Sequence, residues 1–330
     1  METPKKLLEY NRSGLIEEEH YGFIKAFVDG EYFTIGSDND YPIFMRSCAK
    51  PLQASLLYDF ELEKELTSEE IAICCASHWG EPCHIDVLKE LQSKYGITPS
   101  MLTCTASNPV SQKAKDSLIK EGISPSTLHN NCSGKHTLML IMCQKAGWSV
   151  KDYEDFNHPL QKAVKEKIYE LCEINENLPA TNDGCGVPIY SAPLKNFLKG
   201  YINLFCNEKY FQIRDAFLKN PYLIGGEKSI DTAIMTDNSH LIAKVGASGL
   251  CVVLNLENKS AFVVKMSDTD RRARAIVVIK ALRDLKWIKN ETELIDKLYE
   301  TDILTLSGKK VGSVQPCFDL SSINSKLLVQ

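Results

Sequence analysis

The sequence lacks the simple markers of a membrane, secreted or nucleic-acid-binding protein. No stretch approaches about 18 consecutive apolar residues, the length that a membrane-spanning helix needs. Residues 1–6 lead into a polar stretch without the apolar core of a secretory signal, so we expect a cytoplasmic protein. Lys and Arg number 38 against 43 Asp and Glu, and no dense basic run is present. This balance argues against nucleic acid as a partner.

A Cys-x-x-Cys pair is also absent, although the chain contains 12 cysteines. Its absence excludes zinc ribbons, zinc fingers and thioredoxin-like redox sites. The cysteines fall at irregular intervals, and most of them are expected to be small buried hydrophobic residues. Any metal site must therefore combine cysteines that lie far apart in the chain.

Internal repeats, low-complexity blocks and linker-like stretches are missing as well. With 44% hydrophobic and 25% charged residues, the chain has the composition of an ordinary globular protein. We expect one catalytic domain over residues 1–330, in one or two lobes.

The hydrophobic pattern predicts strands near both ends of the chain and helices between them. Alternating residues around Asp29-Gly30 predict a β-hairpin over residues 21–35. Further strands are predicted over residues 241–245, 250–254 and 260–266, and helices over residues 47–58, 68–76, 159–172 and 268–285. The pattern favours an α+β fold with a mixed, largely antiparallel sheet whose edges come from the two ends of the chain.

The segment Arg46-Ser47-Cys48-Ala49-Lys50-Pro51 contains a Ser-x-x-Lys pattern. On a helix this spacing places Ser47 and Lys50 on one face. A partly desolvated lysine has a lowered pKa and can take the serine proton, so that the hydroxyl attacks a carbonyl. The pattern is short enough to arise by chance and carries little weight alone.

Residues 76–82 and 182–188 each concentrate reactive groups in a polar turn. The first reads Ala-Ser-His-Trp-Gly-Glu-Pro, and it also fits an ordinary capped helix end. The second reads Asn-Asp-Gly-Cys-Gly-Val-Pro and places Cys185 in a tight glycine turn, which also fits a purely structural role.

Residues 129–136 read His-Asn-Asn-Cys-Ser-Gly-Lys-His immediately before an apolar helix. So dense a polar cluster at a helix start is suited to capture of an anion or substrate by free backbone N–H groups. It is not a phosphate loop, because position 129 is a histidine where that motif needs glycine.

Taken together and in this order, the four segments resemble the signature of the asparaginase II family, the serine-dependent, class 3 or rhizobial-type L-asparaginases. That signature comprises Arg-Ser-x-x-Lys-Pro, Ala-Ser-His-x-Gly-Glu, His-Asn-Asn-Cys-Ser-Gly-Lys-His and Asp-Gly-Cys-Gly-x-Pro. A later Lys-x-Gly-Ala is matched by Lys244 to Ala247. The resemblance implies a fold related to serine β-lactamases and penicillin-binding proteins, and hydrolysis of the small molecule L-asparagine by a homodimer.

Residue-by-residue matching to the family implies the roles of individual side chains. Ser47 with Lys50 and Ser77 with Lys244 would form two catalytic serine and lysine pairs, and helical spacing favours Ser47 as the acylated residue. One zinc ion would be held by Cys132, Lys135 and Cys185. The expected substrate-binding residues are Arg46, His78, Glu81, Asn131, Asp183, Gly246 and Ala247.

Two of these roles have alternatives that the sequence leaves open. Arg46 is expected either to anchor the substrate carboxylate or to pair with an acidic neighbour. Asp183 is expected to bind the substrate ammonium group or to orient a metal ligand. The chain also departs from the family at Ser229, Ser248 and Thr269, where arginine, glutamate and glycine are usual, which puts substrate preference and loop geometry in question.

Three other functions compete with the asparaginase interpretation. A glutaminase or another Ser-x-x-Lys amidohydrolase would use the same residues. An enzyme acting on β-lactams would be favoured by a Lys-Thr-Gly, which does not occur. A non-enzymatic, zinc-stabilised binding protein would have no need of two lysines beside two hydroxyls.

Overall fold

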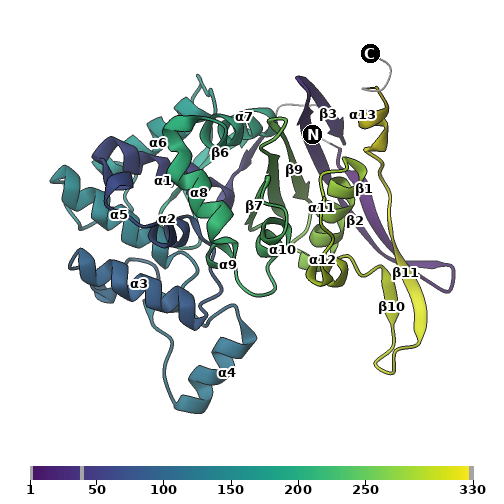
Figure 1. Cartoon of the computed structure of the whole chain (residues 1–330), viewed down its shortest axis with the longest axis horizontal. Helices are drawn as coiled ribbons and strands as arrows, with labels where there is room; N and C mark the ends of the chain where they lie inside the picture. Colours follow the sequence, from purple (N-terminus) through teal and green to yellow (C-terminus); the bar gives the residue numbers. More distant parts are fainter. Residues whose placement is uncertain (1–2, 38–40, 327–330) are drawn as a thin grey trace.

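The computed structural model describes residues 3–37 and 41–326 and contains an antiparallel sheet of eight strands (Figure 1). The strand order is β10, β11, β1, β2, β9, β8, β7, and β3 pairs with the long strand β2. The bounds are β1 Lys5–Arg12, β2 Leu15–Val28, β3 Glu31–Ile35, β7 Leu241–Gly246, β8 Leu250–Asn255, β9 Ser260–Met266, β10 Asp302–Leu304 and β11 Lys310–Pro316. Antiparallel strands with helices grouped beside them confirm the predicted α+β class.

The predicted hairpin is formed by β2 and β3, joined by the two residues Asp29 and Gly30. Both have positive φ, 50° and 89°, as the favoured two-residue hairpin turn requires. The three strands predicted near residues 241–266 are also confirmed, as β7, β8 and β9. Every residue of β8 is buried, as expected for a strand covered on both faces.

Helices cover the sheet and form a separate layer beside β7 (Figure 1). Helix α7 contacts β2, β8 and β9, whereas α11 contacts β1, β8, β9 and β11. The helices are α1 Lys50–Ala54, α2 Ser68–Cys75, α3 Pro82–Lys94, α4 Gln112–Glu121, α5 Ser133–Ala146, α6 Pro159–Leu171, α7 Leu194–Phe205, α8 Phe211–Lys219, α9 Pro221–Ile224, α10 Ile230–Thr236, α11 Arg271–Asp284, α12 Glu293–Leu298 and α13 Ser321–Lys326.

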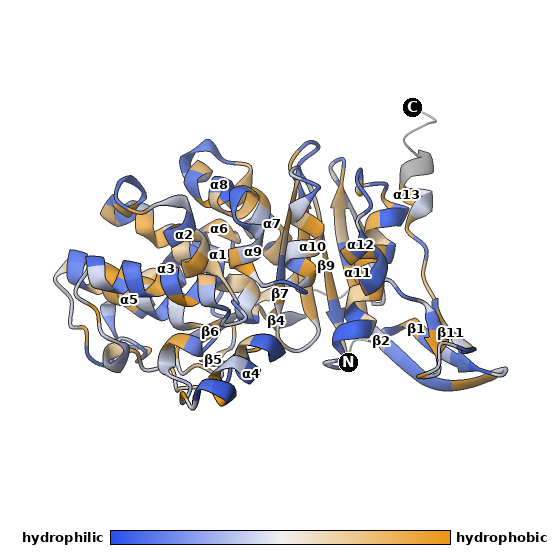
Figure 2. Cartoon of the chain, turned by 60° about the horizontal axis from the view of Figure 1, so that its bottom comes forward, coloured by the Kyte–Doolittle hydropathy of each residue, from blue (hydrophilic) through white to orange (hydrophobic). Residues whose placement is uncertain are grey.

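A small second sheet lies within the helical region. Its strands β4 (Pro42–Phe44), β6 (Pro188–Pro193) and β5 (Ala180–Asn182) pair in that order. Hydrophobic residues are concentrated along β7 and β9 and on the helices beside them, whereas the outer parts of β1, β2 and β11 carry many hydrophilic residues (Figure 2). The core therefore lies where the helices meet the sheet.

Three details of the predicted fold are wrong. The sheet edges are β10 and β7, and the N-terminal strand β1 lies inside the sheet, because β11 returns to pair with it. The helix predicted over residues 47–58 is divided into the 3₁₀ helix η1 (Arg46–Ala49), α1 and the 3₁₀ helix η2 (Ser55–Phe60). Helix α2 ends at Cys75, one residue before the predicted end, and it is capped by Thr67, whose side chain forms a reciprocal capping box with Glu70.

All 12 cysteines are free thiols, and most are buried, as expected. No helix in the described part of the chain is long and apolar enough to cross a membrane.

Candidate active site

The Ser77 hydroxyl lies between the amino groups of two buried lysines. Lys50 Nζ and Lys244 Nζ each lie 3.1 Å from Ser77 Oγ. Lys50 Nζ also donates to the carbonyl oxygens of Ala76, at 2.5 Å, and Asn131, at 2.9 Å. Burial lowers the pKa of Lys50, so its neutral, proton-accepting form is favoured relative to a solvated lysine.

Close helix packing brings α5 against the end of α2, just before Ser77. A Cβ atom added to Gly134 would lie 2.0 Å from the carbonyl oxygen of Ile73, so only glycine fits there. The Ser77 N–H donates to Ile224 O at 3.0 Å, which fixes the segment after α2 against α9. The glycine in the third sequence segment thus allows Asn131, just before α5, to lie near the serine, where both residues line one cavity.

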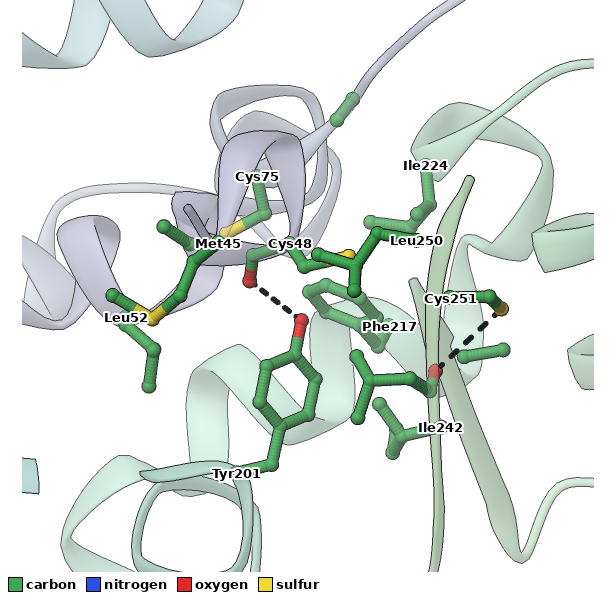
Figure 3. Close-up of a cluster of buried hydrophobic side chains, with 14 of the residues drawn as sticks. Met45, Cys48, Leu52, Cys75, Tyr201, Phe217, Ile224, Ile242, Leu250 and Cys251 are labelled. Atoms are coloured by element: carbon green, nitrogen blue, oxygen red, sulfur yellow. Dashed lines mark hydrogen bonds between the residues drawn. The ribbon is translucent and has the colours of Figure 1, made fainter. Parts of the chain in front are cut away.

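Ser47 is positioned by a strained turn and by contacts between η1 and β7. The preceding residue, Arg46, has φ of 48°, an uncommon value for a residue other than glycine. Cys48 Sγ donates to Lys244 O at 3.1 Å, and the Tyr201 hydroxyl donates to Cys48 O at 2.7 Å within the apolar cluster of Figure 3. A Cβ atom at Gly246 would lie 3.1 Å from Cys48 Sγ, so the small residue allows η1 and β7 to approach.

The predicted pairing of Ser47 with Lys50 has no hydrogen bond within the described residues. Instead, the Lys50 amino group lies 3.1 Å from the hydroxyl of the other serine, Ser77. The two lysines thus share one serine, while Ser47 stands near the start of the helical segment.

Lys244 makes an ion pair that the sequence analysis missed. Its Nζ lies 3.4 Å from Asp231 Oδ2, and both side chains are fully buried. Burial raises the pKa of Asp231, although the positive charge of Lys244 opposes this effect. Asp231 lies two residues after Ser229, one of the positions where the chain departs from the family, but its partner was not apparent from the sequence spacing.

Cys132, Lys135 and Cys185 form a second buried cluster beside the serines. Lys135 Nζ lies 3.0 Å from Cys185 Sγ. A hydrogen bond from Cys185 holds the pKa of Cys132 well below that of an ordinary thiol, and the same bond raises the pKa of Cys185. Burial disfavours the charged form of Lys135, but the two sulfurs outweigh it and raise its pKa. Two thiols and an amine that converge in this way form a donor set suited to zinc.

The two serines line one cavity of about 740 Å³. Asn131, Gly246 and Ala247, three of the residues predicted to bind substrate, also line it. Both lysines lie beneath this surface, with their amino groups directed at Ser77. The cavity therefore presents hydroxyls to a ligand and keeps their potential bases away from water.

A family model described as L-asparaginase II matches residues 8–316 of the chain. The chain belongs to this family. Membership implies an amidohydrolase and agrees with the resemblance noted in the sequence. The match covers all the segments discussed above, including Asp231.

Other comparisons add little to this assignment. No curated protein matches the chain. Among solved structures, the D-alanine carboxypeptidase AmpC from Burkholderia cenocepacia is 13% identical, with a TM-score of 0.38. The alignment covers 78% of this chain and 91% of the other.

Two residues of the family signature, His78 and Glu81, are not among the residues that line the cavity. The buried ring of His78 accepts the Gly80 N–H at Nδ1 and lies 2.9 Å from Ser133 Oγ at Nε2. Burial holds its pKa well below the usual value, so the ring is neutral. Glu81 precedes α3 as its N-cap. Both residues thus connect the loop after Ser77 to neighbouring helices.

Arg46 and Asp183 pair with each other across the site. Arg46 Nε donates to Asp183 Oδ1 at 2.9 Å, and Arg46 also donates to Ser248 Oγ at 2.9 Å. Burial opposes ionisation of Asp183, but the charges of Lys135 and Arg46 and the Gly184 N–H together lower its pKa. The acidic partner that the sequence left open for Arg46 is therefore Asp183.

Glu81, Cys83 and His84 form another group that could hold a metal ion, which the sequence analysis did not identify. Each offers one ligand atom, and these atoms lie within 4.8 Å of one another. The ring of His84 already accepts the Glu81 N–H at 3.2 Å and lies 3.2 Å from Tyr222 O. A metal there would have to displace at least one backbone partner.

Proposed function

We propose that this chain hydrolyses the side-chain amide of L-asparagine to give L-aspartate and ammonia. The observation that carries the proposal is the Ser77 hydroxyl, which lies 3.1 Å from two lysine amino groups beside the cavity. In a member of the L-asparaginase II family, this geometry supplies a proton acceptor next to hydroxyls that can attack an amide.

We infer that Ser47 is the residue that is acylated and that Ser77 passes its proton to Lys50. The Ser77 N–H already donates to Ile224 O, so it is not free to stabilise an oxyanion. The N–H of Ser47 precedes the first hydrogen bond of η1, in which Cys48 N donates to Met45 O. Such an N–H near a helix start is available to the developing negative charge.

The reaction then proceeds in two balanced steps. Ser47 Oγ attacks the side-chain carbonyl carbon, its proton moves by way of Ser77 to Lys50, and the amide nitrogen leaves as ammonia after protonation. Water then attacks the aspartyl ester, which releases L-aspartate and restores the Ser47 hydroxyl. Lys244 donates to Ser77 Oγ and holds it in place, and Asp231 in turn positions Lys244.

The cluster of Cys132, Lys135 and Cys185 is our proposed zinc site, since the described donor set fits that metal. Bound zinc would supply Lewis-acid stabilisation of negative charge near the substrate. Zinc requires both sulfurs and the amine in deprotonated form, so its binding should weaken as pH falls. We also propose that the protein acts as a homodimer in the cytoplasm.

Ammonia release tests the function directly. We expect the purified protein to release ammonia from L-asparagine faster than from L-glutamine, and we expect the Ser47→Ala variant to release almost none. Release from L-glutamine alone would assign the same chemistry to the longer amide. Release from neither amide would reject the proposal.

A β-lactam substrate has less support. Ser37-Asp38-Asn39 matches a tripeptide of β-lactamases, but it precedes Ser47, and Asp38 and Asn39 lie outside the described residues. The Lys-Thr-Gly that accompanies it in those enzymes is absent from the sequence.

A further inference from the structure

The cavity beside the serines is larger than a free amino acid needs. Its volume of about 740 Å³ lies within the range of about 300–1,000 Å³ that is usual for drug-sized ligands. It extends from Ser47 and Ser77 to the start of α11 and to α12. Asparagine at the serines would therefore leave the outer part of the cavity empty.

The outer part of the cavity has a strong excess of positive charge. Its charged lining residues are Lys228, Arg271, Arg272, Arg274 and Lys297, with Glu300 as the only carboxylate among the lining residues in the described chain. Such an excess attracts anions into a partly enclosed site more strongly than it would on a flat surface.

Three of these cations already have partners. Arg272 donates to the carbonyl oxygens of Glu300 and Asp302 and lies over the ring of Tyr10. Lys297 pairs with Glu293 at 2.6 Å. Arg274 donates through Nη1 to Gly246 O at 2.9 Å, and its buried Nε has no partner among the described residues.

Lys228 and Arg271 are the cations available to a ligand. Both are exposed, and neither makes a side-chain hydrogen bond or ion pair with the described part of the protein. They come from different elements, the loop before α10 and the first turn of α11. Arg271 and Arg274 are three positions apart on α11 and thus share one of its faces.

We propose that Lys228 and Arg271, together with the unpartnered Nε of Arg274, form a subsite for a second carboxylate, so that the enzyme also acts on asparagine extended by an acidic group. This inference rests on the proposed function and concerns the same cavity. The reaction is unchanged: water is consumed, the side-chain amide becomes a carboxylate, and ammonia is released. The substrate class is asparagine with an acidic substituent on its amino or its carboxyl group.

Two pairs of substrates test the proposal and distinguish the two directions of extension. One pair is N-succinyl-L-asparagine and its succinyl monomethyl ester, and the other is L-asparaginyl-L-glutamate and its γ-methyl ester. We expect the acid to exceed its ester in kcat/KM by about tenfold in one pair, as for one charge-assisted hydrogen bond. The preference should shrink in high salt, because mobile ions screen it.

The double variant Lys228→Glu/Arg271→Glu should abolish or invert this preference and leave kcat/KM for free L-asparagine within about threefold of the wild type. A matched control is Lys120→Glu on α4, a charge reversal at an exposed position outside the cavity lining. That control should keep the preference unchanged.

Two results would overturn the subsite, and a third would overturn the proposed function with it. Equal kcat/KM for acid and ester in both pairs would show that no second carboxylate is recognised. If the double variant lost kcat/KM equally for free asparagine and for the acidic substrates, these cations would instead bind the ordinary α-carboxylate of asparagine. Either result, found together with activity on free asparagine, refutes the subsite and leaves the proposed function standing. No ammonia from any substrate refutes the proposed function together with the subsite.

Discussion

The buried ion pair between Lys244 and Asp231 makes a quantitative prediction for the Asp231→Ala variant. At 3.4 Å the two charges attract each other by about 5 kcal/mol at an effective dielectric constant of about 20. After the substitution, the Lys244 amino group retains only neutral partners, Ser77 Oγ and Val245 O, each at 3.1 Å. We therefore expect the free energy of unfolding to fall by about 3–5 kcal/mol at neutral pH, as for other broken buried pairs.

Replacement of both partners should recover most of that loss. In Asp231→Ala/Lys244→Met no buried charge remains unpaired, and apolar groups often replace a buried pair at little net cost. Burial raises the pKa of Asp231, so the wild type loses stability as pH rises from the unfolded carboxyl value near about 4 through the raised folded value. The double variant should lack this loss, although it will be inactive.

Urea unfolding followed by tryptophan fluorescence measures these differences, and the chain contains 3 tryptophans. The control is Asp215→Ala, which removes a carboxylate paired at 2.9 Å with Lys219 on the surface. Since both partners there are exposed, its effect should stay below about 1 kcal/mol. An Asp231→Ala protein within about 1 kcal/mol of the wild type would refute the role of the pair.

Four further predictions address the catalytic groups, the metal and the packing. Ser47→Ala should lower kcat by about 10³-fold or more while circular dichroism stays unchanged, and a fully active variant would reject this serine as the nucleophile. Because Lys50 must be neutral to accept a proton, kcat/KM should rise with pH through its lowered pKa, below the ordinary 10.5, and Lys50→Arg should remove that limb of the pH profile. Cys185→Ala should lose bound zinc in elemental analysis and raise KM, and a pure wild-type protein without zinc would contradict the proposed site. Gly134→Ala should destabilise the protein by about 1–3 kcal/mol, because its Cβ would lie 2.0 Å from Ile73 O, and an unchanged thermal midpoint would disprove the close packing.

The sequence predicted the strands better than it predicted the shape of the segment that carries Ser47. The hairpin around Asp29-Gly30 and the strands over residues 241–266 follow from the local alternation of apolar and polar residues and from the turn residues. Both features can be read directly from the sequence. The pairing of β1 with β11 joins opposite ends of the chain, and no local pattern encodes it. The division of the helix over residues 47–58 depends on tertiary contacts, such as the bond from Tyr201 to Cys48, that spacing alone does not reveal.

The candidate site shows the same limit. The motifs singled out Ser77, Lys50 and Lys244, and these side chains meet within hydrogen-bonding distance although they are far apart in sequence. The partner of each lysine could not be read from spacing, because a side chain as long as lysine can reach several neighbours. Asp231 was missed because a single aspartate in the first turn of an apolar helix is also typical of an ordinary helix start.

Mass spectrometry of the enzyme quenched in acid during turnover of L-asparagine tests the central claim most directly. We predict a transient increase in mass equal to one aspartyl group, located by peptide mapping on Ser47 and absent from Ser47→Ala. An aspartyl group on Ser77 would reverse the proposed roles of the two serines. Steady ammonia release with no covalent species on any serine, under conditions in which ester hydrolysis limits turnover, would contradict serine-dependent catalysis by this protein.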